Sequence, residues 1–274
     1  MTLCAKRSPF PLSAGFSRCA LILAALACLV LSGCASVPYT NRSQLVFMSE
    51  SEELSLGAQA SQQVLAKEPE EKGTARAARV ERVGKRIAAV AERPQFQWEF
   101  HTIPSEELNA FCLPGGKVFV YTALLNLTQG NDNELAAVMG HEIAHAVARH
   151  GAERSSQNQI AAVGQMAAQI GVAAATGSAQ AGDSVGQGYG LIAQLGFLLP
   201  YSRTHETEAD TIGIILAAKA GYDPRAALSF WKKMAAKNTG KEPPALLSTH
   251  PLNEQRIEDL EAAMPKAMEY YTKK

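Results

Sequence analysis

The chain has 274 residues, of which 47% are hydrophobic and 19% are charged, so it is long and apolar enough to bury a full core as one large domain or two small ones. Its 26 basic and 26 acidic residues give a formal net charge of zero, which offers no support for nucleic-acid binding or for electrostatic docking on anionic lipid. The aromatic content is only 7%, and the many alanines favour helix.

Residues 1–33 have the features of a signal peptide. Basic residues lead into an uninterrupted apolar run from Cys19 to Leu31, which is too short to span a bilayer comfortably. The run ends in Leu-Ser-Gly-Cys34, which resembles the lipobox of bacterial lipoproteins, where the signal peptide is cut before the cysteine and the thiol is acylated. We therefore expect residues 1–33 to be removed and Cys34 to be lipidated. An ordinary secretory signal or an uncleaved anchor is the alternative.

Lipidation of Cys34 would hold the mature chain on a membrane, because each buried methylene adds about 0.8 kcal/mol of membrane affinity. Cys112 is then the remaining cysteine, so no internal disulfide is expected, and it is predicted to be a small buried hydrophobic residue. Ala35 follows the cysteine and predicts the outer membrane by the usual sorting rule, if the protein is Gram-negative.

The next segments are predicted from hydrophobic periodicity. Residues 34–50 show no clear pattern and are predicted to form the lipidated tether. A helical pattern runs from about residue 52 to residue 92 and weakens around residues 68–73. Alternating apolar and polar residues predict a strand over 95–103, and a second β region spans 109–121 around a Pro-Gly-Gly turn.

The best-marked helix begins at Asn131, where Glu134 three residues later predicts a capping box, and it runs toward His150. Residues 158–199 are rich in Ala, Gly and Gln, with a helix-like half followed by a loop. Three further helices are predicted over residues 203–220, 224–237 and 253–271. The chain is thus predicted to be α+β and mostly helical, with a small β-sheet next to the helix after Asn131 and a single domain over 51–274.

The motif His141-Glu142-Ile-Ala-His145 carries the chemistry. Two histidines four residues apart on a helix share a face, so both imidazoles can reach one metal ion. Glu142 lies beside them, where its carboxylate can take a proton from an attacking water. The alternative is a polar helix face with solvated histidines, but the flanking apolar residues predict a buried segment.

A catalytic zinc needs a third protein ligand. His150 follows His145 by five residues, which places it on the wrong face of a continuous helix. Glu206 is the better candidate, because Asp210 lies four residues later on the same helix face and could accept a hydrogen bond from a ligand histidine. Without the upstream motif, a solvated acidic helix face would be the preferred interpretation of this pair.

The two motifs, separated by about 60 residues, resemble those of the gluzincins of the HtpX, LoiP, BepA and CAAX prenyl endopeptidase family. The resemblance covers roughly residues 50–262, and three further segments agree with it: Asn109–Gly116, Leu135–Met139, and Ser248–Pro251 with Arg256. It implies a gluzincin-type metallopeptidase fold with one Zn²⁺ per chain. The lipoprotein LoiP is the nearest in shape, since the chain lacks the transmembrane helices of HtpX and the C-terminal repeat domain of BepA.

By this resemblance His141, His145 and Glu206 bind zinc, Glu142 is the catalytic base, and Asp210 supports a ligand histidine. His250, which precedes a proline, could enter the cleft and either act on the oxyanion or cap the metal in a latent state; a surface histidine is the alternative. An exposed edge strand that pairs with substrate is predicted over Lys117, Val118, Phe119, Val120 and Tyr121, with a fully covered strand as the alternative.

The sequence therefore predicts a membrane-tethered zinc endopeptidase that hydrolyses misfolded or damaged proteins of the cell envelope, and the intact Glu142 argues against a purely structural zinc, which would need no base there. Its expected partners are unfolded envelope proteins and the membrane reached through Cys34, with no nucleic acid. The expected location is the periplasmic face of the outer membrane. A non-proteolytic or latent zinc-binding chaperone for outer-membrane proteins is the rival hypothesis, and the oligomeric state stays open.

Overall fold

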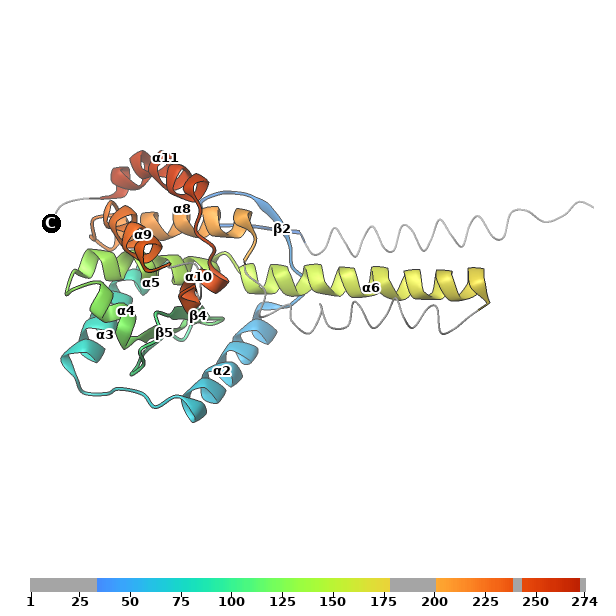
Figure 1. Cartoon of the computed structure of the whole chain (residues 1–274), viewed down its shortest axis with the longest axis horizontal. Coiled ribbons are helices and arrows are strands. Elements are labelled where there is room, and N and C mark those ends of the chain that lie inside the picture. Colours follow the sequence, from blue (N-terminus) through green and yellow to red (C-terminus); the bar gives the residue numbers. More distant parts are fainter. Residues whose placement is uncertain (1–33, 178–200, 239–242, 272–274) are drawn as a thin grey trace, which may run out of the picture.

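The computed structural model describes residues 34–177, 201–238 and 243–271. The predicted signal peptide (1–33) lies outside the described residues, as does most of the loop predicted within 158–199. The elements form a helical body around a small sheet, from which one long helix projects (Figure 1). The prediction of a mostly helical α+β fold is confirmed.

The three-stranded sheet has the order β3-β5-β4, with bounds Glu99–Ile103 for β3, Ala110–Leu113 for β4 and Lys117–Tyr121 for β5. β5 pairs parallel with β3 and antiparallel with β4. The prediction that Lys117–Tyr121 is an exposed edge strand is therefore wrong: the Pro-Gly-Gly turn folds β4 back along one side of β5, β3 covers the other side, and all five residues are buried. β4 is the edge that faces the cavity described below.

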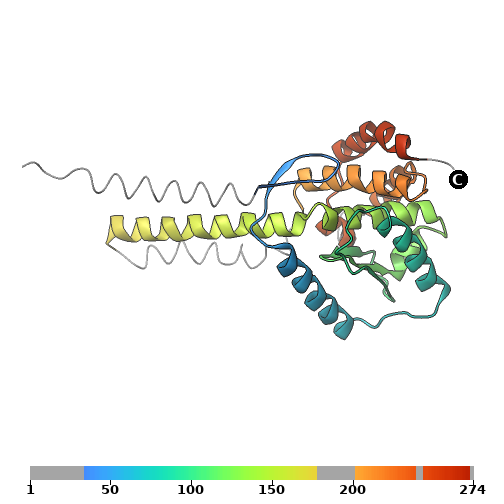
Figure 2. The same cartoon turned by 180° about the vertical axis from the view of Figure 1, so that it is seen from behind.

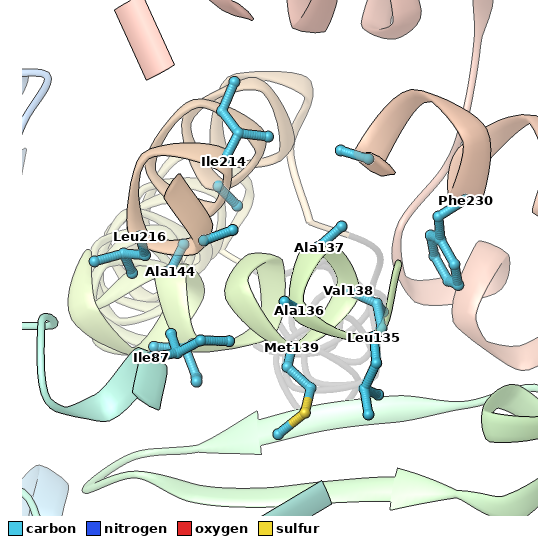
Figure 3. Packing of buried hydrophobic residues seen from close by; sticks show 14 of the residues in the cluster. Ile87, Leu135, Ala136, Ala137, Val138, Met139, Ala144, Ile214, Leu216 and Phe230 are labelled. Atoms are coloured by element: carbon cyan, nitrogen blue, oxygen red, sulfur yellow. The ribbon is translucent and has the colours of Figure 1, made fainter. Parts of the chain in front are cut away.

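The helix that carries the metal-binding motif, α5 (Asp132–Val147), is the centre of the core. In Figure 3, its Leu135 and Met139 point toward the sheet, and side chains of α3 (Ala75–Ala88), α8 (Arg203–Lys219) and α9 (Ala226–Lys237) surround it. Because both faces of α5 are covered, every residue from Glu134 to Val147 is buried. The prediction that the segment around the His-Glu motif is buried is confirmed.

The two helices that carry the motifs lie against each other at glycines. A Cβ on Gly140 of α5 would lie 2.8 Å from the carbonyl oxygen of Gly213, and a Cβ on Gly213 would lie 2.8 Å from the backbone nitrogen of His141. These distances are shorter than ordinary van der Waals contacts, so only glycine permits this approach. The close contact fixes the spacing between the two motifs.

The start of α5 differs from the predicted capping box. Asn131 accepts a hydrogen bond from the backbone N–H of Asn133 at 3.0 Å, as an N-cap residue does. Glu134 instead turns to α9, where Ser229 and Lys233 each donate to its carboxylate at 2.7 Å. The capping-box prediction is wrong because this tertiary ion pair takes the carboxylate.

The helices predicted over residues 203–220, 224–237 and 253–271 are confirmed to within two residues, whereas two short helices, α4 (Thr122–Leu127) and α10 (Ala245–Thr249), were not predicted. The predicted helical region of residues 52–92 is two helices that break at the predicted weak point. Their bounds, with those of the other elements, are α2 (Glu50–Lys67), α3 (Ala75–Ala88), α4 (Thr122–Leu127), α6 (His150–Thr176), α10 (Ala245–Thr249) and α11 (Glu254–Tyr270). α6 projects from the body (Figure 2). Among the described residues, no helix combines the length and apolar character needed to cross a membrane.

The segment predicted as a lipidated tether, residues 34–50, is folded. β1 (Cys34–Ser36) pairs antiparallel with β2 (Ser43–Leu45), and the turn between them carries Val37, which is fully buried in the main core. α2 then begins at Glu50 with a complete capping box from Ser49. The segment from residue 34 to residue 50 is therefore part of the domain.

Candidate metal centre

Four side chains from three parts of the fold converge at one point. α5 contributes His141 and His145, α8 contributes Glu206, and the residue that ends α10 contributes His250. One ligand atom from each lies within 4.8 Å of the others, and all four residues are buried. The structure thus brings together the predicted ligands and His250, which the sequence alone left between two alternatives.

The distances within this cluster are those of groups directed at a shared point. His145 Nε2 lies 3.1 Å from His141 Nε2 and 3.3 Å from Glu206 Oε1. His250 Nδ1 lies 3.0 Å from Glu206 Oε1 and 3.3 Å from His141 Nε2. Imidazole nitrogens and a carboxylate oxygen in a buried cluster are the donor set of a catalytic zinc site, so these residues fit that ion.

Glu142 lies next to the cluster and has an unused oxygen. In the part of the chain that the structure describes, Glu142 Oε1 is buried without a hydrogen-bond partner, and its Oε2 lies 3.6 Å from His250 Nε2. Burial raises the pKa of Glu142 to about 7, although the nearby His250 opposes this shift. A carboxyl group with a pKa near neutrality can take and return a proton at the pH at which most enzymes work.

Asp210 orients one of the histidines, as predicted for its position. Its Oδ1 lies 2.9 Å from His141 Nδ1, which places the histidine proton on Nδ1 and leaves Nε2 free to face the cluster. Burial raises the pKa of Asp210, but Arg256 and His141 outweigh this effect and hold the pKa below its usual value. Asp210 is therefore a carboxylate that can fix the His141 tautomer.

Arg256 has a role that the sequence did not reveal. Its guanidinium is buried, donates from Nε to Asp210 Oδ2 at 2.6 Å, and lies 2.6 Å from Glu206 Oε2 through Nη1. It also stacks on the ring of Trp231 at 4.3 Å. The only sequence signal for Arg256 was its place in the resemblance, because its partners lie about 50 residues away in the chain.

A cavity of about 530 Å³ opens beside Glu142 and His250. β4 forms one wall and α2 forms another, and Tyr201 lines it as well. Tyr201 stacks on His145 with ring centroids 4.0 Å apart and on His250 at 5.3 Å. Nothing in the sequence singled out Tyr201 except its place just before a predicted helix.

Three other predicted positions lie outside the cluster. Cys34 is in β1. Lys117–Tyr121 fill the centre of the sheet, whereas the cavity is lined by the neighbouring strand. Cys112 in that strand is only half-buried and lines the cavity, so the prediction of a small buried hydrophobic residue is confirmed only in part, although burial raises the pKa of its thiol.

His150 lies beside the cluster, although a continuous helix would have turned it away. α5 ends at Val147, and Arg149 adopts a left-handed conformation with φ of 59° before α6 begins at His150. The bend brings His150 Nδ1 to 2.9 Å from His145 Nδ1. His150 is not one of the four clustered side chains, but the sequence argument assumed a continuous helix and missed this contact, because no glycine marked the bend.

Comparison with known proteins agrees with this site. Residues 74–264 match peptidase family M48. The chain belongs to this family. The M48 match spans both motifs and confirms the predicted family, the zinc cofactor and a metalloendopeptidase domain.

Curated proteins similar to this chain are also named as a metalloendopeptidase or a protease. The chain is 43% identical over 189 residues to the mitochondrial metalloendopeptidase OMA1 of Schizosaccharomyces pombe, a match that covers 69% of this chain and 53% of the relative. It is 33% identical over 179 residues to the beta-barrel assembly-enhancing protease of Escherichia coli, covering 65% of this chain and 36% of the relative. The M48 chain thus spans between about a third and a half of the length of these relatives.

Proposed function

We propose that the protein is a membrane-tethered zinc endopeptidase in which His141, His145 and Glu206 hold the metal and Glu142 is the general base. The observation that carries this proposal is the buried convergence of the three ligand side chains next to a Glu142 oxygen that has no hydrogen-bond partner among the described residues. When bound, zinc polarises the scissile carbonyl and acidifies the attacking water. Glu142 Oε1 takes the proton of that water and passes it to the leaving amine.

Contacts from Asp210 and Arg256 hold two of the metal ligands, His141 and Glu206, in position. Asp210 fixes the His141 tautomer, and Arg256 holds Asp210 and Glu206 together from outside the cluster. The positive charge of Arg256 offsets two buried carboxylates, which would otherwise favour a proton over a metal ion. The ligand side chains are therefore already oriented before the metal binds, which lowers the free-energy cost of ordering them.

We assign substrate binding to the edge of β4 that pairs with no other strand among the described residues. Tyr121 N–H donates to Asn109 O, and residues alternate in an antiparallel ladder, so Ala110 and Cys112 direct their backbone N–H and C=O groups away from β5. An extended peptide added there would lie along the cavity that contains Glu142. Main-chain pairing does not depend on side chains, which suits a peptidase for unfolded proteins.

The second candidate is a latent form of the same molecule, and the position of His250 favours it. His250 Nδ1 lies among the other ligand atoms, where it would occupy the coordination position that a substrate carbonyl or water needs. In this form the protein binds zinc without cleaving peptides, as the rival chaperone hypothesis requires. Displacement of His250 would convert one form into the other.

The proposals for location and natural substrates rest on the N-terminal sequence and on the name of a relative. The lipobox-like sequence supports cleavage after residue 33 and acylation of Cys34 on the outer membrane. Misfolded or damaged envelope proteins are the proposed substrates, and the name of the beta-barrel assembly-enhancing protease supports a role for this chain in the assembly of beta-barrel proteins. The mitochondrial relatives show that the domain also serves other compartments, so location is a separate proposal from catalysis.

The test is casein cleavage by the full chain purified in detergent. Wild type, Glu142→Gln and a chelator-treated sample with zinc restored are compared, with bound zinc measured for each. We expect one zinc per chain, cleavage by wild type, and none by Glu142→Gln, which keeps the ligands and loses the base. Equal cleavage by Glu142→Gln would disprove the assigned base, and zinc binding without cleavage in wild type would favour the latent form.

A further inference from the structure

A continuous line of polar side chains connects the metal centre with the N-terminal hairpin. His145 Nδ1 lies 2.9 Å from His150 Nδ1, and His150 Nε2 lies 3.0 Å from Glu208 Oε2. Arg42 Nε donates to that same oxygen at 2.9 Å. The histidines and Glu208 are buried, whereas the Arg42 side chain is 26% exposed. The line therefore runs from a proposed zinc ligand in the core to an arginine near the surface.

The geometry fixes the position of each proton along this line. His145 Nε2 faces the metal cluster, so a metal-binding His145 carries its proton on Nδ1 and donates it to His150 Nδ1. His150 then carries its own proton on Nε2 and donates it to Glu208. The orientation of the ligand ring thus depends on a carboxylate two hydrogen bonds away.

Arg42 is the cation that holds this carboxylate. Its guanidinium spans two buried carboxylates, since it contacts Glu208 through Nε and Glu153 through Nη1 at 2.8 Å and Nη2 at 2.6 Å. Thr40 donates a further hydrogen bond to Glu208, and His205 Nε2 lies 3.0 Å from Glu153. Loss of the guanidinium would leave two buried carboxylates without their cation, and Glu208 would be free to turn.

The N-terminal hairpin presents Arg42 in a defined way. The Val37 backbone N–H donates to the Arg42 carbonyl at 2.9 Å, which closes the turn between β1 and β2. Val37 itself is fully buried in the main core, so the hairpin is anchored by its own side chain. Arg42 is therefore held against α6 and α8 by the fold and does not merely extend from a free surface loop.

We propose that Arg42 is a positioning residue for the metal centre, acting through Glu208 and His150 to hold His145 in its zinc-binding orientation. The inference rests on the proposed zinc site. It makes the hairpin after Cys34 a component of the active site, although no residue of the hairpin reaches the metal cluster.

The test compares Arg42→Met with Arg79→Met in the full chain purified in detergent. Arg79 is a matched control, because it is also partly buried and pairs with a carboxylate, Asp132, at 2.8 Å. Two quantities are measured: the zinc dissociation constant, by competition with a chromophoric chelator, and the thermal unfolding midpoint of the zinc-free protein. We expect Arg42→Met to raise the dissociation constant about 10- to 100-fold. Arg79→Met should change it less than about twofold while lowering the midpoint.

Two further variants identify the route. Arg42→Lys keeps the positive charge but loses the planar guanidinium that contacts both carboxylates, so it should give an intermediate loss of zinc affinity. If Arg42→Met does not fold, Arg42→Lys replaces it in the test. Glu208→Gln should itself weaken zinc binding, and adding Arg42→Met to it should have little further effect. Independent losses in the double variant would overturn the route through Glu208.

The outcomes separate this inference from the proposed function. Wild-type zinc affinity in both Arg42→Met and Arg42→Lys, with only a lower unfolding midpoint, would overturn the positioning role and show that Arg42 serves stability alone. Failure of the wild-type chain to bind zinc would instead remove the proposed zinc site itself.

Discussion

Gly213→Ala is the sharpest test of how the two motif helices are held. A Cβ at this position would lie 2.8 Å from the His141 nitrogen and 2.9 Å from its Cα, where ordinary contacts begin at 3.4 Å. The obstructing atoms are helix backbone and cannot rotate away. α8 must therefore move from α5 by roughly half an ångström. That movement displaces Glu206 relative to the histidine ligands.

Two opposing effects set the expected change in the unfolding free energy of Gly213→Ala. Overpacking of a core costs about 1–3 kcal/mol, whereas replacing glycine by alanine within a helix contributes about 1 kcal/mol in its favour. We expect Gly213→Ala to lose ~1 kcal/mol of unfolding free energy, which lowers Tm by about 2–4 °C in a domain of this size. Zinc affinity should fall by about tenfold, because the ligands no longer fit one ion at ideal distances.

The assay is thermal unfolding of the zinc-free protein together with a zinc competition titration. Gly164→Ala in α6 is the control, since a Cβ there meets no atom within 4 Å. It should leave zinc affinity unchanged and Tm equal or slightly higher. A Gly213→Ala protein that behaves like Gly164→Ala in both measurements would refute the close contact between α5 and α8.

His250→Ala should raise the rate of casein cleavage if His250 closes the metal site, and a loss of cleavage with zinc still bound would instead make it catalytic. Burial raises the pKa of Glu153, but hydrogen bonds from Arg42 and His205 outweigh it and hold the pKa at about 2. The resulting stabilisation, ~3 kcal/mol, is complete above pH 4.5 and disappears as the pH falls toward 2, so Glu153→Gln should flatten an acid unfolding curve in this range. Cys34→Ala should abolish incorporation of a labelled fatty acid and release the protein from membranes on fractionation; an unchanged distribution would rule out the lipid anchor.

The parts of the site that lie within one helix could be predicted from the sequence. His141 and His145 share a face because four residues make about one helical turn, and the same spacing relates Glu206 to Asp210. Such relations depend only on local backbone geometry. His141 and His145 were predicted in this way, whereas Glu206 was assigned to the same metal through the upstream motif and the family resemblance, and His250 was named with its role open.

The parts of the fold and the site that depend on contacts between distant segments could not be predicted from the sequence. The order of the strands follows from pairing across the turn and from the parallel partner β3, and neither leaves a mark on the composition of Lys117–Tyr121. The bend at Arg149 uses a residue that rarely adopts positive φ, and it is held by a hydrogen bond to Glu53 of α2. Arg256 pairs with Asp210 across two helices. Each of these is a tertiary interaction that overrides a local preference.

If Cys34 carries the proposed lipid, the folded hairpin that starts at this residue sets the distance from the membrane at which the peptidase works. A disordered leader as long as the stretch before α2 would extend to roughly 50 Å and let the domain sweep a wide shell. Here β1 begins at the cysteine itself, so a lipid on that residue would leave almost no flexible linker between the bilayer and the folded domain. Substrates would then be limited to chains that emerge within one domain diameter of the lipid.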